Sequence, residues 1–451
     1  MRSRLLCCLF ASVLASLSSA QTKVLFLTHS AGFKHGVIRR AKQGQAAWAE
    51  HNLRNFAASQ FEVVATKDCS SITAENLKNY AAVVFYTTGE LPISPENRQA
   101  LYSWIQAGGG FVGIHCATDT LYKDPKYGEM IGGYFAGHPW HMKVPILVED
   151  STHPATALLG ERFEFTDEIY QFRNFNADNV DVLLRLDPKF KQIGKGRHKE
   201  SNYYAVAWSR DYGKGRVFYT SLGHRREVWV DPTFLKHLTS GIRWAMRSEN
   251  HLTKAPEGAK VLFDGTNLDQ WTHQNGKNPA AWTVADGVMT VAKGAGSIIT
   301  KEKFGDCHLH VEFKTPAPVG DKKGQARGNS GVYVQRRYEV QILDSFGLPP
   351  MHNGCAALYR TRQPDANACA KPDTWQYYDI YFTTPRFDED GKKTANARFT
   401  VIHNDVMVHH DAEIPNKTGA GKKEGPEKMP LLLQDHGNPV SFRNIWIVEK
   451  E

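Results

Sequence analysis

The stretch GNSGVYVQRRYEVQILDS, from Gly328 to Ser345, indicates the fold of the second half of the chain. Its apolar, β-branched segments Val332–Val334 and Val340–Leu343 are predicted strands on either side of a short polar turn at Arg336–Arg337. The stretch therefore predicts a β-hairpin.

One face of this hairpin is polar. Side chains two residues apart in a strand share a face, so Arg337, Glu339 and Gln341 are expected to point the same way, followed by Asp344. Such a face packs poorly but suits a polyhydroxylated ligand. The alternative is a solvated outer face with an ordinary Arg–Glu ion pair, which is common on protein surfaces.

The chain around the hairpin, from Lys260 onward, consists of short strand-like segments separated by Gly, Asn, Asp and Pro. The expected strands are Lys260–Phe263, Trp282–Val284, Val288–Val291, Ser297–Thr300, His308–Lys314, Tyr377–Thr383, Arg398–His403, Val406–His409 and Ser441–Glu449. Their regular spacing, with almost no helical periodicity, predicts an all-β jelly-roll sandwich. Asn404–Asp405, between two of them, is a tight-turn signature.

A second polar cluster lies just before the last expected strand and contains Gln434, Asp435, His436, Asn438 and Arg443. Two clusters distant in sequence can meet on one face of a jelly roll, where extended sugars are held. Stacking surfaces for a sugar could come from Trp271, Trp282 and Trp375, although at least two of these are expected in the core.

This half of the chain resembles the 3-keto-disaccharide hydrolase family, which has a concanavalin-like sandwich. Besides the hairpin, the matching segments within 260–449 are LFDGTNLDQW, YYDIYFTTPRFDEDGKK, HNDVMVHHD and PLLLQDHGNPVSFRNIW. The resemblance implies action on glycosides already oxidised to a ketone at C3. Such a ketone acidifies the hydrogen on C2, so a base can remove it, the C1 substituent leaves by β-elimination, and water adds back.

That chemistry needs a base, a group that polarises the ketone and an acid for the leaving oxygen. The candidates are Glu339 or His436 as base, Arg337 or a bound cation as polariser, and Asp344 or His436 as acid. The residues expected to bind sugar hydroxyls are Gln341, Gln434, Asn438, Asn329 and Arg443. A divalent cation held by Glu339 and Asp344 would serve, but the sequence does not require one. An ordinary glycosidase would need two carboxylates framing the bond, and the opposite strand parity of Glu339 and Asp344 weighs against it.

The first half of the chain alternates strands and helices. Strands are expected at Val24–Leu27, Phe61–Ala65, Ala82–Tyr86 and Phe111–Gly113, and helices at Ala41–Ala58 and Ser94–Gln106, with Ser94 as N-cap and Pro95 in the first turn. This alternation predicts a doubly wound α/β domain with a parallel sheet, whose site lies at the carboxyl ends of the strands.

Histidines concentrate at those expected strand ends. The candidate binding residues there are His29, His35, His115, Asp119, His138, His141, Tyr170 and His224. They suggest either a metal site or acid–base chemistry, but none has the His-x3-His spacing of a helical zinc motif, so the metal signal is weak. Structural or surface histidines are the alternative for each.

This domain resembles the ThuA-like (trehalose-utilisation) family, which is related in fold to flavodoxin-like class I glutamine amidotransferases. The matching segments are HSAGFKHG, GGGFVGIHCATDT, GGYFAGHPWH, DEIYQF and SLGHRREVW. His115 stands where the amidotransferase cysteine is expected, while His224 and Glu227 match the catalytic His and Glu. Without a thiolate at the turn, acyl transfer has no nucleophile, so the resemblance implies a keto-sugar pocket with His115, His138 and His224. A shifted nucleophile at Cys116 is the rival.

Residues 1–20 have the pattern of a cleaved secretory signal: Arg2 and Arg4, an apolar run too short to span a bilayer, and small residues before Gln21. A secreted or periplasmic protein is therefore expected, with an uncleaved anchor as the alternative. The expected domains are residues 21–249 and 260–451, joined by a linker at 250–259.

The remaining composition limits the partners. The formal charge of +8 becomes +6 without the signal and contains no Lys/Arg block, so neither nucleic acid nor a membrane is an expected partner, whereas a small sugar is. Five cysteines remain, an odd number, and Cys355 with Cys369 is the expected disulfide. The crowding of titratable residues favours an enzyme; the alternative is a carbohydrate-binding protein without turnover.

Overall fold

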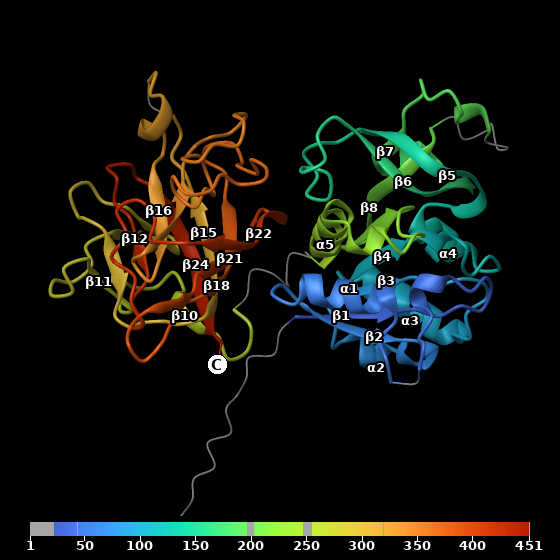
Figure 1. Cartoon of the computed structure of the whole chain (residues 1–451), viewed down its shortest axis with the longest axis horizontal. Coiled ribbons are helices and arrows are strands. Elements are labelled where there is room, and N and C mark those ends of the chain that lie inside the picture. Colours follow the sequence, from blue (N-terminus) through green and yellow to red (C-terminus); the bar gives the residue numbers. More distant parts are fainter. Residues whose placement is uncertain (1–21, 43, 196–202, 247–254, 319, 451) are drawn as a thin grey trace, which may run out of the picture.

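The computed structural model describes residues 22–42, 44–195, 203–246, 255–318 and 320–450. The chain forms two lobes, an α/β domain followed by an all-β domain (Figure 1). The expected signal segment and part of the linker lie outside the described residues. Within the described residues, no helix is long and apolar enough to cross a membrane.

The first domain is built on a nine-stranded sheet in the order β2-β1-β3-β4-β9-β8-β7-β5-β6. Its parallel part consists of β1 (Lys23–Leu27), β2 (Glu62–Thr66), β3 (Ala82–Phe85), β4 (Gly110–Ile114) and β9 (Gly215–Thr220). Strands β1, β3 and β4 in the middle of this part are almost wholly apolar because both of their faces are covered. The predicted doubly wound α/β arrangement is confirmed.

The helices lie on both sides of this sheet. They are α1 (Trp48–Ala57), α2 (Ala74–Leu77), α3 (Pro95–Gln106), α4 (Pro125–Ile131) and α5 (Pro232–Met246). As expected, Ser94 caps α3 by accepting a hydrogen bond from the Asn97 amide, with Pro95 in the first turn. The helix expected at 41–58 begins only at Trp48.

The sequence did not reveal that the sheet continues in antiparallel fashion. The additional strands are β5 (Tyr134–Val148), β6 (Arg162–Arg173), β7 (Asp181–Leu186) and β8 (Ala205–Tyr212). The long β5–β6 ribbon places the GHPWH and DEIY segments, both in those strands, beside the ends of the parallel strands.

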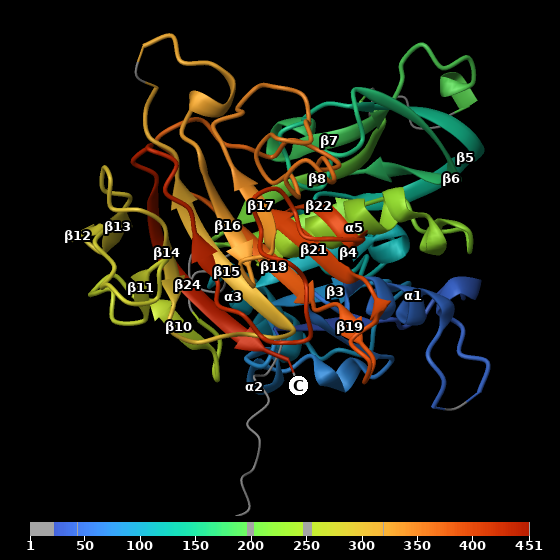
Figure 2. The same cartoon turned by 60° about the vertical axis from the view of Figure 1, so that its left-hand side comes forward.

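The second domain is a sandwich of two antiparallel sheets, as predicted (Figure 2). The larger sheet contains β10 (Lys260–Phe263), β12 (Thr283–Ala285), β13 (Val288–Thr290), β15 (Cys307–Lys314), β18 (Gln376–Thr383), β21 (Ala397–His403), β22 (Val406–Ile414) and β24 (Ser441–Glu449). The five-stranded sheet contains β11 (Trp271–His273), β14 (Ile298–Thr300), β23 (Leu432–Leu433), β16 (Ser330–Val334) and β17 (Tyr338–Ile342). Trp271 and Trp282 lie in the core between the sheets, as expected for two of the tryptophans.

Two tight turns connect neighbouring strands. Asn404 and Asp405 both have positive φ, so the predicted turn between β21 and β22 is confirmed. In the β16–β17 hairpin the residues with positive φ are Gln335 and Arg336, so this turn lies one residue earlier than predicted. The strand then begins at Tyr338 and leaves Arg337 outside it.

The predicted disulfide between Cys355 and Cys369 is not formed. All five cysteines of the described residues are buried free thiols. The Cys355 sulfur lies 3.1 Å from the Tyr378 hydroxyl, and the Cys369 thiol donates to the Leu343 carbonyl at 3.4 Å. The two thiols also hydrogen-bond each other, so they lie side by side in the core without a covalent link.

The two domains contact each other through a buried ion pair. Arg243 on α5 donates to Asp379 on β18 at 2.6 Å, and the other carboxylate oxygen of Asp379 contacts His308 at 3.0 Å and His310 at 2.9 Å. Burial alone would raise the pKa of Asp379, but His310, His308 and Arg243 outweigh it and hold the pKa well below its usual value. The outer face of the larger sheet is thus the docking surface for the first domain.

Arg243→Met is expected to lower the free energy of unfolding by about 3–5 kcal/mol, because it leaves Asp379 buried without its cation. Arg398→Met, which removes an exposed ion pair with Asp411, is the control and should cost less than about 1 kcal/mol. Chemical denaturation of the full chain measures both, and equal small losses would contradict a stabilising role for Arg243.

Candidate active site and histidine cluster

The outer face of the five-stranded sheet carries the first candidate site. In the β16–β17 register Tyr333 lies opposite Glu339, and Gly331 lies opposite Gln341. The intervening valines point to the core between the sheets. Strand alternation therefore sends the polar residues outward, as the sequence predicted for Glu339 and Gln341.

Glu339 is almost fully buried on this face. The Tyr333 hydroxyl donates to its Oε2 atom at 2.7 Å, and the opposing strand leaves room for its carboxyl only because residue 331 is glycine. Burial raises the pKa of Glu339 to about 7, with the Tyr333 hydrogen bond acting in the opposite direction. A carboxyl group with such a pKa can both take up and release a proton near neutral pH.

Amides surround this carboxyl group. With its nitrogen turned toward Glu339, the Gln341 amide donates to Oε1 at 3.0 Å and to the Ser330 carbonyl at 3.0 Å. Asn329 donates to the Gln325 carbonyl at 2.8 Å and lies beside the Gln341 amide. These amides are suited to binding hydroxyl groups.

The second polar cluster reaches this face only in part. Gln434 follows β23, donates its backbone N–H to the Gly331 carbonyl at 3.0 Å, and its side chain donates to the Tyr333 hydroxyl at 3.4 Å. The buried Oε1 atom of Gln434 has no hydrogen-bond partner among the described residues. His436 is exposed in the loop beyond it, and Asn438 accepts from the Gly328 N–H at 3.1 Å.

Three predicted site residues are engaged elsewhere. Arg337 is fully buried and donates to the Lys423 and Glu427 carbonyls and to the side chains of Gln335 and Glu427. Asp344 is held by Arg327 through contacts of 2.6 and 3.0 Å. Arg443 lies on the larger sheet, where it pairs with Glu312 at 2.5 Å and covers the Trp375 ring.

These placements correct the expected roles. Arg337 anchors the loop after β22, so its guanidinium cannot also polarise a ketone, and Asp344 is paired away from Glu339. Neither Glu339 nor Asp344 belongs to a group of three or more candidate metal ligands in the described residues. The site has instead a partner that the sequence analysis missed, Tyr333, whose place opposite Glu339 could have been found from the hairpin register.

The second candidate site lies at the carboxyl ends of the parallel strands of the first domain. His35 follows β1, His115 directly follows β4, and His224 follows β9. The His115 Nδ1 atom lies 2.7 Å from the Ser221 carbonyl, and its Nε2 atom lies 3.1 Å from His224 Nδ1. Tyr170 packs against the His115 ring, with centroids 4.2 Å apart.

The carboxylate beside these histidines is Glu168, not the predicted Glu227. Glu168 on β6 lies 3.2 Å from His224, 3.5 Å from His138 and 3.8 Å from His141. Glu227 is exposed. The β5–β6 ribbon, which the sequence did not reveal as an antiparallel extension, thus supplies three residues of the cluster.

Burial keeps the imidazoles neutral. Desolvation lowers the pKa of His35 to about 3 and that of His224 to about 4, and it holds the pKa of the fully buried His115 well below its usual value. Neighbouring histidines also lower these three pKa values. Burial likewise raises the pKa of Cys116 well above its usual value, so the rival thiolate nucleophile is not supported.

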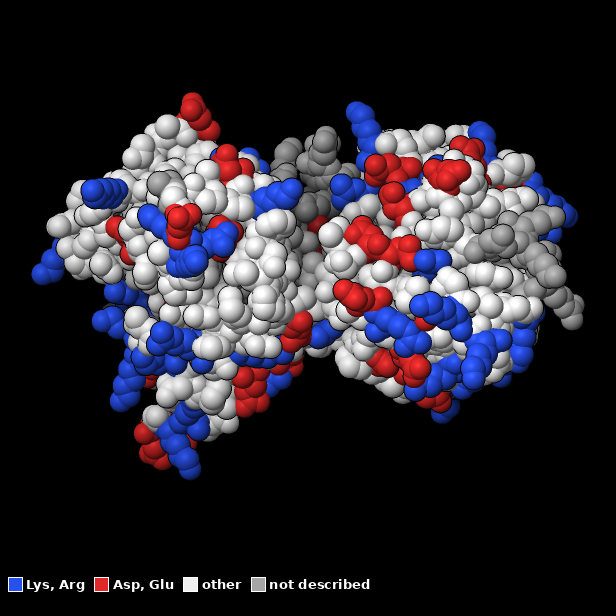
Figure 3. All heavy atoms as spheres, turned by 90° about the horizontal axis from the view of Figure 1, so that it is seen from above, with Lys and Arg blue, Asp and Glu red and all other residues white. Residues whose placement is uncertain are grey.

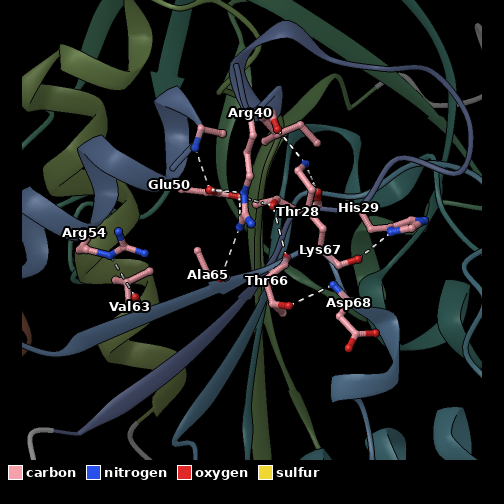
Figure 4. A network of polar contacts seen from close by, with 12 residues as sticks. Thr28, His29, Arg40, Glu50, Arg54, Val63, Ala65, Thr66, Lys67 and Asp68 are labelled. Carbon is pink, nitrogen blue, oxygen red and sulfur yellow. Dashed lines mark hydrogen bonds and ion pairs between the residues drawn. The ribbon is translucent and has the colours of Figure 1, made fainter. Parts of the chain in front are cut away.

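Two predicted residues lie at the margin of this cluster. Asp119 accepts a hydrogen bond from the Tyr122 hydroxyl at 2.6 Å. His29 contacts the Lys67 carbonyl at 2.8 Å in the network drawn in Figure 4, where Arg40 pairs with the buried Glu50. This network forms part of a cavity of about 630 Å³ lined by His29, Ser30, Lys34, His35, Ile38, Arg39, Arg40, Ala41, Lys42, Gly44 and Lys67.

Two overlapping groups here have the composition of a metal site. They are His35–His115–His224 and His141–Glu168–His224, and within each group the candidate ligand atoms lie within 4.8 Å of one another. Among the described residues, the clusters that could hold a cation therefore lie in the first domain rather than beside Glu339.

The family comparisons agree with the two lobes. Residues 23–245 match the ThuA family, described as trehalose utilisation, and residues 258–448 match the family described as a 3-keto-α-glucoside-1,2-lyase-like domain. Both families inferred from the sequence, and their order, are confirmed. No curated protein matches the chain.

Two solved structures each match about half of the chain or less. The chain is 40% identical to a "putative glycosyl hydrolase" from Parabacteroides distasonis, with a TM-score of 0.41, over 44% of this chain and 85% of that chain. It is 23% identical to a "putative thua-like protein" from Bacteroides uniformis, with a TM-score of 0.37, over 50% of this chain and 92% of that chain.

Gly331→Ala is expected to displace the Glu339 carboxyl, because the added Cβ would lie 2.6 Å from Oε1. The displaced group should become less buried, so the pKa of Glu339 should fall from about 7 toward the ordinary value. Carbon-13 titration of labelled glutamate carboxyls, assigned with Glu339→Gln, measures this pKa. Gly354→Ala, with no contact under 3.5 Å, is the control, and an unchanged pKa in Gly331→Ala would contradict the steric argument.

Proposed function

We propose that this chain, a ThuA domain followed by a 3-keto-α-glucoside-1,2-lyase-like domain, is a carbohydrate-active enzyme that cleaves 3-keto-glycosides beside Glu339. The observation that carries the proposal is a buried carboxyl, with a pKa of about 7, on a strand face furnished with amides. A general base works best when its pKa lies near the working pH.

The proposed reaction begins with proton transfer from C2 of the 3-keto sugar to Glu339. The resulting enolate re-forms the C3 ketone as the C1–O bond breaks, and the leaving oxygen takes up a proton. Water then adds to the unsaturated ketone, with its hydroxyl on C1 and a proton on C2. The net change is hydrolysis of the glycosidic bond.

The neighbouring side chains support this assignment. Burial and the adjacent Glu339 carboxylate raise the pKa of Tyr333, so its hydroxyl remains a proton donor. Gln341, Asn329 and Gln434 supply amides for sugar hydroxyls, and Gln434 has an unused acceptor. His436, two residues beyond Gln434 and exposed, is the proposed acid for the leaving oxygen.

The first domain is proposed to bind or process a related keto-sugar at its histidine cluster. The support is the ThuA match together with the neutral imidazoles of His35, His115 and His224. Export, after cleavage near Gln21, is proposed from the signal-like first 20 residues. Charges of both signs are interspersed on the face shown in Figure 3, in keeping with a small-molecule substrate.

Glu339→Gln is expected to lower kcat/KM for a 3-keto-glucoside by about 10²–10⁴-fold, the usual contribution of a general base. The full chain is assayed in deuterated water, and the wild type should release the leaving group and place deuterium at C2. Glu413→Gln removes an exposed carboxylate paired with Arg398 and is the matched control.

Full turnover by Glu339→Gln would exclude Glu339 as the base. Sugar binding by the wild type without release of a product would favour the carbohydrate-binding alternative. Release without deuterium at C2 would point to direct hydrolysis of the C1–O bond.

The pH dependence provides a separate test. A base must be ionised, so kcat/KM should rise as the pH increases through about 7. Tyr333→Phe removes a hydrogen bond that lowers the pKa of Glu339, so the midpoint should move to higher pH. Tyr338→Phe is the control, because the Tyr338 hydroxyl bonds Glu424 instead. A midpoint unmoved by Tyr333→Phe would assign the titration to another group.

A further inference from the structure

We propose that His35, His115 and His224 form a metal site in the first domain that takes Zn²⁺ or a similar divalent transition-metal ion. The three residues are contributed by separate loops at the carboxyl ends of the parallel strands β1, β4 and β9. Imidazole nitrogen is a preferred ligand for such ions, and catalytic zinc sites use three protein ligands and an open position. The site is independent of the reaction proposed for the second domain.

The three rings surround a common point. Their centroids are 5.2 Å apart for His35 and His115, 5.4 Å for His35 and His224, and 5.1 Å for His115 and His224. The interplanar angles of 68–88° make them a tripod rather than a stack. Tetrahedral coordination at the usual Zn–N distance needs ligand atoms roughly 3.3 Å apart, and His115 Nε2 already lies 3.1 Å from His224 Nδ1.

The hydrogen bond of His115 prepares it as a ligand. A backbone carbonyl can only accept, so the contact of 2.7 Å with Ser221 fixes the proton on Nδ1 and leaves a lone pair on Nε2. This is the outer-shell arrangement usual for metal-bound histidines. His115 also has a φ of 47°, a conformation uncommon outside glycine and typical of residues held in place for function.

His35 is buried, yet one of its ring nitrogens has no hydrogen-bond partner among the described residues. It is 4% exposed, and among the described residues its Nδ1 atom has no hydrogen-bond partner. An unsatisfied buried polar atom costs about 1–3 kcal/mol, so a native structure that retains one calls for an explanation. A bound ion in the tripod would draw the His35 ring into coordination and account for its position.

The surroundings leave room for a ligand of the ion. Glu168 lies 3.2 Å from the same Nδ1 atom of His224, so it is placed to join the coordination or to accept a proton from metal-bound water. Cavities of about 630 Å³ beside His35 and about 420 Å³ beside His224 give access to small molecules. The fourth position would take an oxygen atom from water or from a sugar.

The test is a titration of the metal-free full chain with Co²⁺, whose visible ligand-field absorption reports on coordination. One equivalent is expected to bind, with displacement by Zn²⁺. His35→Gln and His224→Gln should each weaken the affinity by about tenfold or more, judged by the usual effects of disturbing metal sites. His51→Gln, at an exposed position on α1, should have no effect.

X-ray absorption of the Zn²⁺-loaded wild type needs no variant and therefore remains informative if a variant fails to fold. Imidazole scattering from about three nitrogens at roughly 2.0–2.1 Å is expected. The proposal is overturned if the wild type binds no Co²⁺, if folded His35→Gln and His224→Gln retain the wild-type affinity, or if the zinc spectrum lacks histidine scattering.

Discussion

The transfer of ionisable side chains from water into the protein is the constraint on which both sites and the domain interface depend. A buried charge is costly unless it is paired, and an unpaired buried group changes its protonation instead. Asp379 is paired with Arg243 and two histidines and stays ionised. Glu339 accepts hydrogen bonds mainly from the neutral Tyr333 hydroxyl and the Gln341 amide, and its pKa is about 7. The number and charge of the hydrogen-bond partners thus distinguish the structural carboxylate of Asp379 from the carboxyl of Glu339, which is proposed as the base.

Much of the fold follows from periodicity along the chain. Alternation by two residues places Glu339 and Gln341 on one face while the valines between them enter the core, and this could be predicted from the hairpin alone. Parallel strands end at one edge of a sheet, so His35, His115 and His224 could be expected near one another. In both cases the geometry of the strands alone is sufficient to predict which side chains lie together.

Contacts between distant segments set the limit of such prediction. Arg337 leaves the expected face because its acceptors lie in the loop at Lys423 and Glu427, about which the hairpin sequence carries no information. Glu168 replaces Glu227 beside His224 because β6 pairs with β5, which the α/β pattern did not include. Side-chain roles therefore depend on pairings that only the tertiary structure supplies.

The docking of α5 on the larger sheet has a consequence for the transfer of small molecules between the two domains. Because that sheet faces the first domain, Glu339 lies on the other side of the sandwich, with two sheets about 10 Å apart between it and the interface. A product of the proposed reaction beside Glu339 would therefore enter the surrounding solution before it could reach the histidines. The covalent linkage therefore fixes equal amounts of the two domains, but a product of one domain would reach the other only through the solution.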